Sequence, residues 1–594
     1  MRFPSVREAL GRARKSAERF PLALAAGVVA AVAAGLAVGA EAEETQYLRA
    51  TLAALVGLPL AFVLALAAER WRPGRSGAWL AGAVAVAVPV WFFFQSSGWS
   101  LTLLFTRFFH LAAGLHLAVA FLPFVGWAGE NGFWQYNRTL FLRFLLAGLY
   151  SAVLFVGLAL ALLALDQLFG VGVREETYPR LFFVIAFVFN TWFFVAGVPT
   201  DLAALEEQRD YPAGLRAFTQ FVLMPLVGIY LLILTAYLGR VLITRMWPSG
   251  WIGWLVSSVA VAGTLALLLV HPLREREGHG WINAYGRWFF VLLLPSVGML
   301  LAAILRRVGQ YGFTERRYIL LVLALYLAGI AIWYAATGSR RIRLIPLILS
   351  LVAFATLAGP WSAYAVSRRS QLARFTSELA RNGMLVDGVA RRATAEVSLE
   401  DRGRMSGALE YLIETHGTAS IAAVVGAELA GEPQRGPGRF ATDRAAAVMS
   451  GLGLDYVSGW QAGGERQLYF TAKTDSLALG VSGYAYLLET DLARPSTVRA
   501  GEDTITLSMD TVTLVVTLSR NGREAMRLDL ASEMARLAEA GGGSGVPLPP
   551  ERLVFEAAGE GAAARVQLRT LSGTESAGRY RVRLARALVL LRFD

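Results

Sequence analysis

Residues 138–169, RTLFLRFLLAGLYSAVLFVGLALALLALDQLF, form an almost uninterrupted apolar stretch. A helix that crosses about 30 Å of hydrocarbon needs about 20 apolar residues, so this stretch is long enough to span a membrane. About eleven such blocks lie before residue 370, at approximately 20–40, 47–68, 77–95, 102–125, 138–169, 178–199, 214–240, 250–272, 281–306, 317–337 and 342–365. This pattern predicts a mainly α protein, a polytopic transmembrane bundle of about 11 helices, followed by a soluble α+β C-terminal domain.

The overall composition supports the same fold class. Of the 594 residues, 55% are hydrophobic and only 17% are charged, whereas a typical soluble chain has roughly 25% charged residues. This composition excludes a disordered chain, a collagen-like chain and a purely soluble enzyme. The chain has no cysteine, which excludes disulfides, a thiol nucleophile and a cysteine metal site.

The positive charge of the chain has a simple explanation in a membrane protein. The formal net charge is +12, and every basic residue except Lys15 and Lys473 is an arginine. Many of these arginines flank apolar blocks, as cations do at bilayer surfaces. We therefore expect a lipid bilayer as partner, with anionic lipids among its contacts, and no nucleic acid. The sequence identifies neither a protein partner nor an oligomeric state.

The orientation follows from the first connections. Residues 1–19 form a basic leader, and the first block is longer than the 7–15-residue apolar core of a cleaved signal, so we expect a retained helix. Residues 41–44 are acidic, and the next connection carries Arg70, Arg72 and Arg75. The positive-inside rule then places the N-terminus in the cytoplasm. The expected organisation is a cytoplasmic leader at 1–19, a bundle at 20–368 and a C-terminal domain at 369–594.

The later arginines leave two topologies open. If all eleven blocks span, the C-terminal domain lies outside the cytoplasm together with Arg306, Arg307, Arg316, Arg317, Arg368 and Arg369. That placement opposes the positive-inside rule. Either one block is re-entrant and the tail is cytoplasmic, or these arginines are held there for a specific reason. We favour the extracytoplasmic domain.

The composition changes near Ser370. Helical patterns cover 370–385, 398–414 and 441–449, and the second begins at a capping-box pattern, Ser398 to Asp401. Strand patterns cover 504–507, 512–518, 525–530, 554–556, 564–571 and 580–593. Asn521-Gly522 predicts a tight hairpin. A helix at 532–540 precedes a flexible loop at Gly541–Gly545.

The sequence contains no pattern typical of a catalytic or metal site. The five histidines lack metal-ligand spacing, and neither a phosphate-binding loop nor a nucleophile motif occurs. We therefore assign no catalytic residue, cofactor or metal. Polar groups inside apolar blocks are more informative, because their burial in hydrocarbon is costly. Asn190 lies in the sixth block, and Arg107 and His110 lie one turn apart in the fourth.

Three clusters at block ends combine helix breakers with polar residues, at 190–220, 310–318 and 359–371. Irregular backbone at such ends can line a polar cavity, although capped turns at the membrane boundary would have the same composition. The candidate residues for a polar membrane cavity are Asn190, Asp201, Arg216, Gln220, Gln310, Glu315, Arg316 and Trp361. The candidate contacts for anionic lipids are Arg306, Arg307, Arg368 and Arg369.

These clusters resemble, in order, a bacterial multi-pass membrane family, domain of unknown function DUF4153. The matching stretches are RFPLAL (19–24), FNTWFFVAGVP (189–199), YPAGLRAFTQFVLMPLVGIYLLILTAY (211–237), QYGFTERRY (310–318), IPLILS (345–350) and GPWSAYAVSRRSQLARF (359–375). The resemblance implies a protein of the bacterial cytoplasmic membrane with a soluble C-terminal region. It implies no activity and no catalytic residues.

Three functions are compatible with the sequence. The leading hypothesis is a transport or export-type envelope component, because polar residues and irregular boundaries interrupt the bundle. The second is a non-catalytic sensor or assembly scaffold, because an amphipathic helix joins the bundle to the α+β domain. The third, ranked last, is an enzyme acting on a lipid-linked substrate held by arginine pairs. Transport or enzyme activity would be favoured if one cavity contained Asn190, Asp201, Arg216, Glu315 and Arg316. The sensor or scaffold would be favoured if these residues lay at separate helix ends.

Overall fold

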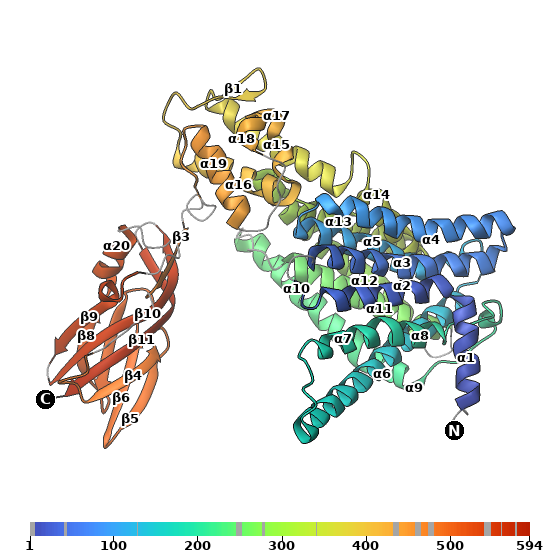
Figure 1. Ribbon diagram of the computed structural model, residues 1–594, viewed down its shortest axis with the longest axis horizontal. Coiled ribbons are helices and arrows are strands. Elements are labelled where there is room, and N and C mark those ends of the chain that lie inside the picture. Colours follow the sequence, from blue (N-terminus) through green and yellow to red (C-terminus); the bar gives the residue numbers. More distant parts are fainter. Residues whose placement is uncertain are drawn as a thin grey trace. The chain divides into compact units, whose positions relative to one another are not determined.

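The first half of the chain folds as a helical bundle in the computed structural model (Figure 1). The structure describes residues 6–40, 44–127, 129–244, 252–275, 280–339, 341–431, 439–457, 465–472, 480–539, 548–559, 561–576 and 579–593. Helix α1 (Val6–Arg19) precedes α2 (Pro21–Ala37), α3 (Glu44–Trp71), α4 (Arg75–Gln95), α5 (Leu101–Phe121) and the long α6 (Asn131–Phe169).

The next two pairs of helices are each joined by a π-helical segment. Helices α7 (Thr177–Phe183) and α8 (Asn190–Val195) are joined by π-helical Val184–Phe189, and α9 (Ala213–Phe218) and α10 (Met224–Thr244) by π-helical Thr219–Leu223. The bundle is completed by α11 (Ile252–Leu269), α12 (Gly280–Tyr311), α13 (Glu315–Thr337) and α14 (Leu344–Leu357), and it leads into α15 (Ala363–Arg381). Each predicted apolar block therefore contains helix.

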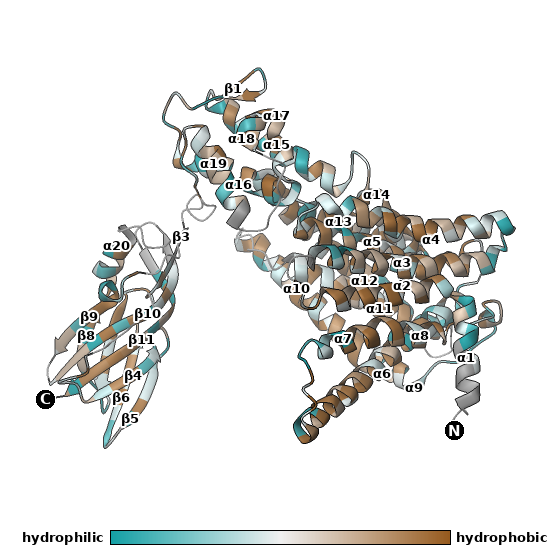
Figure 2. Ribbon diagram, in the orientation of Figure 1, coloured by the Kyte–Doolittle hydropathy of each residue, from teal (hydrophilic) through white to brown (hydrophobic). Residues whose placement is uncertain are grey.

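The described residues form eight helices that are long and apolar enough to cross a membrane, and three shorter apolar helices at Pro21–Ala37, Gly253–Leu269 and Leu344–Leu357. Large apolar side chains are exposed along the outside of α6, for example Phe144, Val153 and Leu160. Figure 2 shows the apolar residues along most of that helix. Such a surface is unfavourable in water but suits lipid. The prediction of a multi-pass membrane bundle is confirmed.

Contacts between helix ends divide those ends into two groups. At the N-terminal end of the bundle, Arg19, the last residue of α1, pairs with Glu69 near the end of α3, with Nε–Oε1 at 2.7 Å. Its Nη1 also donates to the carbonyl of Val198, after α8. At the same end Arg343, before α14, pairs with Glu130, before α6, at 2.8 Å.

The remaining helix ends gather at the opposite end of the bundle. Arg180, in the middle of the short helix α7, donates to the carbonyl of Gly35 near the end of α2 at 3.2 Å. Tyr318, in the first turn of α13, donates to the carbonyl of Trp361 after α14 at 2.5 Å. Consecutive apolar helices thus start and finish at alternating ends, which is the arrangement that eleven successive passes produce.

The residues after α15 begin with small elements. A two-stranded turn, β1 (Leu385–Val386) and β2 (Val389–Ala390), precedes α16 (Leu399–His416), α17 (Ala422–Val425), α18 (Ala427–Ala430) and α19 (Arg439–Gly451). Helix α16 begins as its capping-box pattern predicts, because the Ser398 Oγ accepts a hydrogen bond from the Asp401 amide at 3.1 Å. The predicted helices at 370–385, 398–414 and 441–449 correspond to α15, α16 and α19.

Two antiparallel sheets follow, packed around one apolar core that includes Leu507, Val516, Leu518, Val566 and Val589. One sheet has the order β3-β10-β11-β4, with β9 also pairing with β10, and the other has the order β5-β6-β7-β8. The strands are β3 (Glu465–Thr471), β4 (Tyr486–Asp491), β5 (Ser496–Ala500), β6 (Asp503–Met509), β7 (Val515–Arg520), β8 (Arg523–Asp529), β9 (Val554–Gly559), β10 (Ala562–Ser576) and β11 (Arg579–Phe593). Helix α20 (Ala531–Glu539) lies between β8 and β9 in the chain.

The hairpin prediction is confirmed, because Asn521 and Gly522 have φ angles of 52° and 79° between β7 and β8. The prediction that a strand begins at Val512 is wrong. The Asp510 Oδ1 accepts the amide of Val512 at 2.8 Å, which forms a turn, and β7 begins only at Val515. Strands β3, β4 and β5 were not predicted. The predicted loop at 541–545 lies outside the described residues.

By its internal contacts the chain divides into two compact units. The first comprises Met1–Arg374, Tyr411–Ala423 and Ala430–Ala441, and the second comprises Phe375–Glu410, Val424–Leu429 and Thr442–Asp594. The boundary expected at 368/369 stays a prediction. The last six residues of α16 thus belong to the same unit as the bundle.

Candidate functional site

The turn between α12 and α13 is held by the start of α15. The Gln371 Nε2 donates to the carbonyls of Tyr311 at 2.9 Å and Phe313 at 2.8 Å. The Ser370 Oγ accepts the amide of Phe313 at 2.9 Å. Gly312 has a φ of +69°, and a Cβ there would lie 2.9 Å from the Gln371 Nε2, so the turn favours glycine. The second and third sequence clusters therefore contact each other.

Glu315, the first residue of α13, is the buried acid of this region, with 6% of its surface exposed. Its Oε1 lies 3.2 Å from the Nε2 of His416. Its Oε2 accepts a hydrogen bond from the Tyr411 hydroxyl. Both partners lie in the last turns of α16. The positive end of the α13 dipole also stabilises a carboxylate at this position.

The protonation state of Tyr411 fits its role as a hydrogen-bond donor to Glu315. Burial, together with the negative charge of Glu315, raises the pKa of Tyr411 well above its usual range. The hydroxyl therefore keeps its proton at any physiological pH and remains able to donate to the carboxylate. A buried carboxylate needs such partners, because leaving it without hydrogen bonds is costly.

Beside this contact lies a cavity of about 370 Å³. Its polar lining includes Arg107 from α5, Tyr364 and Arg368 from α15, and His416. The Arg107 guanidinium lies 4.4 Å from the ring centre of Trp99 and 4.3 Å from that of Tyr364, so two aromatic faces hold it. The remaining described lining residues are Trp91, Phe92, Trp99, Leu111, Leu357, Ala358, Gly359, Ser362 and Ala365.

His110, one turn after Arg107, supports the wall of this cavity rather than lining it. Its Nδ1 lies 3.3 Å from the Tyr364 hydroxyl, and its Nε2 lies 3.1 Å from the Thr356 hydroxyl. The His110 imidazole and the hydroxyls of Thr356 and Tyr364 thus link α5, α14 and α15. Through Tyr364 this arrangement fixes one of the two rings that hold Arg107.

The first sequence cluster makes its contacts elsewhere in the bundle. Asn190, at the start of α8, donates to the Ser151 hydroxyl of α6 at 3.1 Å. The Asp201 Oδ1 accepts the amides of residues 203 and 204 in its own loop. The Arg216 Nε lies 3.4 Å from the Gln220 Oε1, one turn along the same helical segment. These contacts do not bring the cluster to Glu315.

The remaining predicted residues do not share the burial of Glu315. Gln310 and Arg316 are exposed. Trp361 is 60% exposed, and its Nε1 donates to the carbonyl of Ala355. Among the candidate lipid contacts, Arg306, Arg307, Arg368 and Arg369 are all exposed. Arg369 donates to the carbonyl of Pro360, and Arg368 lines the cavity.

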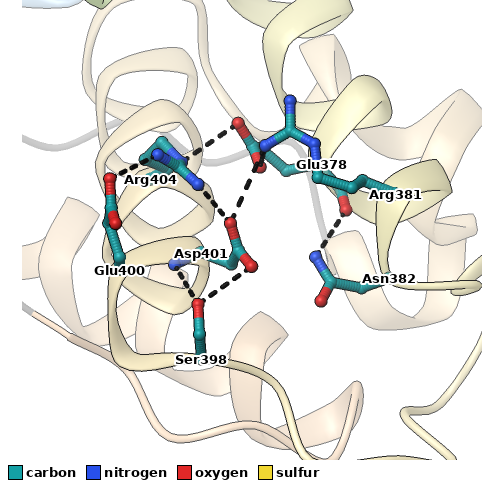
Figure 3. A network of polar contacts seen from close by, with 7 residues as sticks. All are labelled: Glu378, Arg381, Asn382, Ser398, Glu400, Asp401 and Arg404. Carbon is teal, nitrogen blue, oxygen red and sulfur yellow. Dashed lines mark hydrogen bonds and ion pairs between the residues drawn. The ribbon is translucent and has the colours of Figure 1, made fainter.

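The start of α16 is held by a second polar network (Figure 3). The Arg404 guanidinium lies 3.2 Å from the Glu378 Oε1 and 2.6 Å from the Glu400 Oε1, and it also pairs with Asp401. Arg381 pairs with Glu378 at 2.7 Å. These contacts join α15 to the first turns of α16. Helix α16 therefore has polar anchors near both of its ends.

Burial works to raise the pKa of Asp401, but hydrogen bonds from Arg404 and Ser398 outweigh it and hold that pKa below its usual range. Asp401 is therefore a carboxylate at neutral pH. Within the described ranges no group of three or more His, Asp or Glu side chains could hold a metal ion. The network is an ion-pair cluster between two helices.

Tyr411 and His416 were not predicted to be functional residues. His416 lies about 100 positions after Glu315, in a region expected to be soluble, and no local pattern links the two residues. Arg107 and His110 were noted only as polar residues in an apolar block. The structure shows that their surroundings include α15 and α14, which the spacing of residues within α5 cannot reveal.

Comparisons with known proteins agree with this architecture. A family model described as "Domain of unknown function (DUF4153)" matches residues 22–392. The chain belongs to the DUF4153 family. The match includes Arg107, Glu315 and Arg368 but ends before Tyr411 and His416.

One curated relative is the "Uncharacterized protein PM1469" of Pasteurella multocida (strain Pm70), which is 25% identical over 279 residues. This similarity covers 45% of the present chain and 46% of that protein, so the DUF4153 chain spans about half the length of its relative. No solved structure matches the chain. Family membership thus identifies a multi-pass membrane protein of unknown function.

Proposed function

We propose that this DUF4153 protein is a non-catalytic sensor or assembly scaffold of the bacterial cytoplasmic membrane. The observation that carries the proposal is the hydrogen bond from Tyr411 to Glu315, together with the approach of the His416 Nε2 to within 3.2 Å of the same carboxylate. A buried acid at the end of a membrane helix is bound by a helix that follows the bundle in the chain. The contact fixes the end of α16 to the bundle.

Helix α16 is well placed to convey a change. Its first turns carry Asp401 and Arg404, which pair with Arg381 and Glu378 of α15. Its last turns carry Tyr411 and His416, which contact Glu315. A helix anchored at both ends can respond as one element when either anchor changes. No nucleophile–base pair accompanies Glu315 among its contacts described above, which fits a binding and coupling role better than catalysis.

We further propose that the N-terminus is cytoplasmic and that the region after α15 lies outside the cytoplasm. The alternation of helix ends supports eleven crossings, which place those two parts on opposite sides. Arg70, Arg72 and Arg75 belong to the N-terminal end, as the positive-inside rule favours. The re-entrant alternative would place both parts on one side.

Hydrogen–deuterium exchange on the full-length protein in nanodiscs tests the coupling. Glu315→Gln keeps the size of the side chain but removes the carboxylate charge that the Tyr411 hydroxyl donates to. We expect faster exchange in the last turns of α16, within 411–416, and a smaller increase near 399–404. Arg316→Gln, which changes the adjacent exposed residue, is the matched control. Unchanged exchange in Glu315→Gln would remove the basis of the proposal.

Partner binding requires a separate test. A photo-crosslinking residue at the exposed Tyr469 or Leu487 of the β-sheets, introduced into the full chain in native membranes, would capture a scaffold partner. We expect one defined crosslinked product in the wild type and less of it in Glu315→Gln. A product pattern that is identical in the two proteins would contradict a scaffold controlled by Glu315.

A transport or export role is the second candidate, and the π-helical segments favour it. π-Helical turns inside α-helices often occur at functional sites. Asn190 directly follows one such segment and Gln220 lies in the other. The Gln220 Nε2 is buried and has no hydrogen-bond partner among the described residues. Loss of solute flux in proteoliposomes of Asn190→Ala, with flux retained in Glu315→Gln, would select transport over the scaffold.

A further inference from the structure

We infer that the cavity beside Glu315 binds the phosphate of an anionic amphiphile, with a membrane phospholipid headgroup as its occupant. The inference rests on the proposed function in one respect, because the occupant would act on α16 through His416. The cavity itself is defined independently by Arg107, Arg368 and His416.

The charge of the cavity lining indicates the chemical class of the ligand. Two arginines and one histidine face the cavity, and its described lining contains no Asp or Glu. Guanidinium groups match the geometry of phosphate oxygens and form strong, charge-assisted hydrogen bonds with them. An anion would therefore be favoured, whereas a cation would be repelled.

The walls of the cavity indicate an amphiphile rather than a small, fully hydrated ion. Trp91, Trp99, Leu111 and Leu357 contribute apolar surface around the cationic groups. The volume of about 370 Å³ exceeds the roughly 30 Å³ share of one water molecule by about tenfold. A headgroup with its first ester and methylene groups would use both the charged and the apolar parts of the lining.

The position of the cavity along the helices matches the depth of the lipid headgroups. The lining comes from the last turns of α4, the first turns of α5, the end of α14 and the start of α15. These helix ends lie together at the end of the bundle opposite the N-terminus. Trp residues are enriched at headgroup depth. Arg368 is exposed, so the cavity reaches the surface of this unit.

His416 connects the cavity to the coupling contact. It lines the cavity and also faces Glu315 at 3.2 Å. A phosphate in the cavity would compete with the Glu315 carboxylate for the same imidazole. Occupancy would then change how firmly α16 is held to α13, which makes the headgroup the input of the proposed sensor.

The test uses the purified full-length protein in detergent, titrated with dioleoyl-phosphatidylglycerol and followed by native mass spectrometry. We expect saturable binding of one lipid, with Kd about tenfold weaker in Arg368→Gln and in Arg107→Gln, the effect of losing a charge-assisted hydrogen bond. Arg75→Gln, which removes an exposed arginine at the start of α4 on the other end of the bundle, is the control with unchanged Kd.

Two further titrations identify the source of the phosphate. Dioleoyl-phosphatidylcholine should bind at least tenfold more weakly than phosphatidylglycerol, because its choline brings a positive charge toward the arginines. Inorganic phosphate that displaces the lipid with similar affinity would support the phosphate site and assign it to a soluble phosphate. Equal binding of the two lipids, or wild-type affinity in Arg368→Gln, would overturn the inference.

Folding of the variants is checked by monodisperse elution. Because Arg368 is exposed, Arg368→Gln keeps the inference testable even if Arg107→Gln, which removes a packed side chain, does not fold. Exchange in 411–416 is then measured with and without phosphatidylglycerol. Binding without any change in exchange would retain the headgroup site and contradict the sensor, so the two failures are distinguishable.

Discussion

The two ends of the bundle use the same residue types for different purposes. At the N-terminal end, Arg343 pairs with Glu130 and also donates to the carbonyls of Phe124 and Trp127. Arg19 likewise pairs with Glu69 and donates to two loop carbonyls. Both guanidinium groups thus donate to glutamates and carbonyls of the protein itself. We call the end that contains Arg19 and Arg343 the closed end, and the opposite end, with Glu315 and the cavity, the open end.

The opposite end also has an acid and arginines, but their described contacts differ. Glu315 accepts a hydrogen bond from Tyr411 and lies 3.2 Å from His416, and Arg107 and Arg368 line a cavity. Arg107 is held by aromatic rings, which position it without neutralising its charge. The comparison teaches that arginines bound to glutamates and loop carbonyls join helix ends, whereas arginines among aromatic side chains line a cavity.

The largest effect is expected when the closed end is broken. Arg343→Met removes a largely buried ion-pair partner and leaves the Glu130 Oε1 and two carbonyls without their side-chain donor. Such a loss costs on the order of 3 kcal/mol. The thermal unfolding midpoint of the detergent-solubilised protein should fall by several degrees. Arg75→Met, which removes an exposed arginine, is the control.

Equal midpoints for Arg343→Met and Arg75→Met would show that the N-terminal end is not held by its ion pairs. The contrast between a closed and an open end would then lose its energetic basis. A larger fall for Arg368→Met than for Arg343→Met would reverse the comparison, because it would make Arg368 part of the structural framework.

An intermediate effect is expected at the open end. Tyr411→Phe removes one donor from the Glu315 carboxylate and leaves the packing of the ring almost unchanged. A hydrogen bond to a charged group contributes about 2 kcal/mol. We expect a smaller decrease in the unfolding midpoint than for Arg343→Met, together with faster exchange in 411–416.

Tyr230→Phe is the control for this variant, because Tyr230 is 41% exposed on α10. If Tyr411→Phe resembled Tyr230→Phe in both measurements, the Glu315 contact would contribute nothing to the attachment of α16. The open end would then consist of the cavity alone.

The sequence predicts the bundle well because hydrophobicity is a local property. Residues 138–169 are apolar by themselves, and the structure forms one helix there, α6. The hairpin at Asn521-Gly522 was predicted for the same reason, since the turn needs two residues with positive φ. Strands β3 and β5 were not predicted, because Glu465, Arg466 and Arg499 interrupt their apolar pattern.

The candidate site was only partly predictable. Glu315 was selected because it is a charged residue at the end of an apolar block. Its partners Tyr411 and His416 come from a helix about 100 residues later, and nothing in the local pattern of α16 points to α13. The π-helical segments beside Asn190 and Gln220 were also not predicted, because their apolar composition is the same as that of an α-helix.

The smallest effect concerns the other anchor of α16 and has a defined dependence on pH. Because the folded protein holds the pKa of Asp401 below its usual value, the Asp401 carboxylate stabilises the fold at pH values above about 3.9, the unfolded value. This contribution is lost as the pH falls below 3.9 through the lower pKa of the folded state. At neutral pH we expect Asp401→Asn to cost about 0.5 kcal/mol, as for ion pairs screened by solvent. The difference in unfolding midpoint between wild type and Asp401→Asn, measured from pH 7 to pH 3, should therefore shrink as the solution becomes acidic.

Asp455→Asn, at a side chain that is 91% exposed, is the control and should show a smaller difference in unfolding midpoint from the wild type at neutral pH. A difference for Asp401→Asn that grows on acidification would mean that the start of α16 is held by something other than the Asp401 carboxylate, and the two anchors of this helix could no longer be compared as ionic contacts.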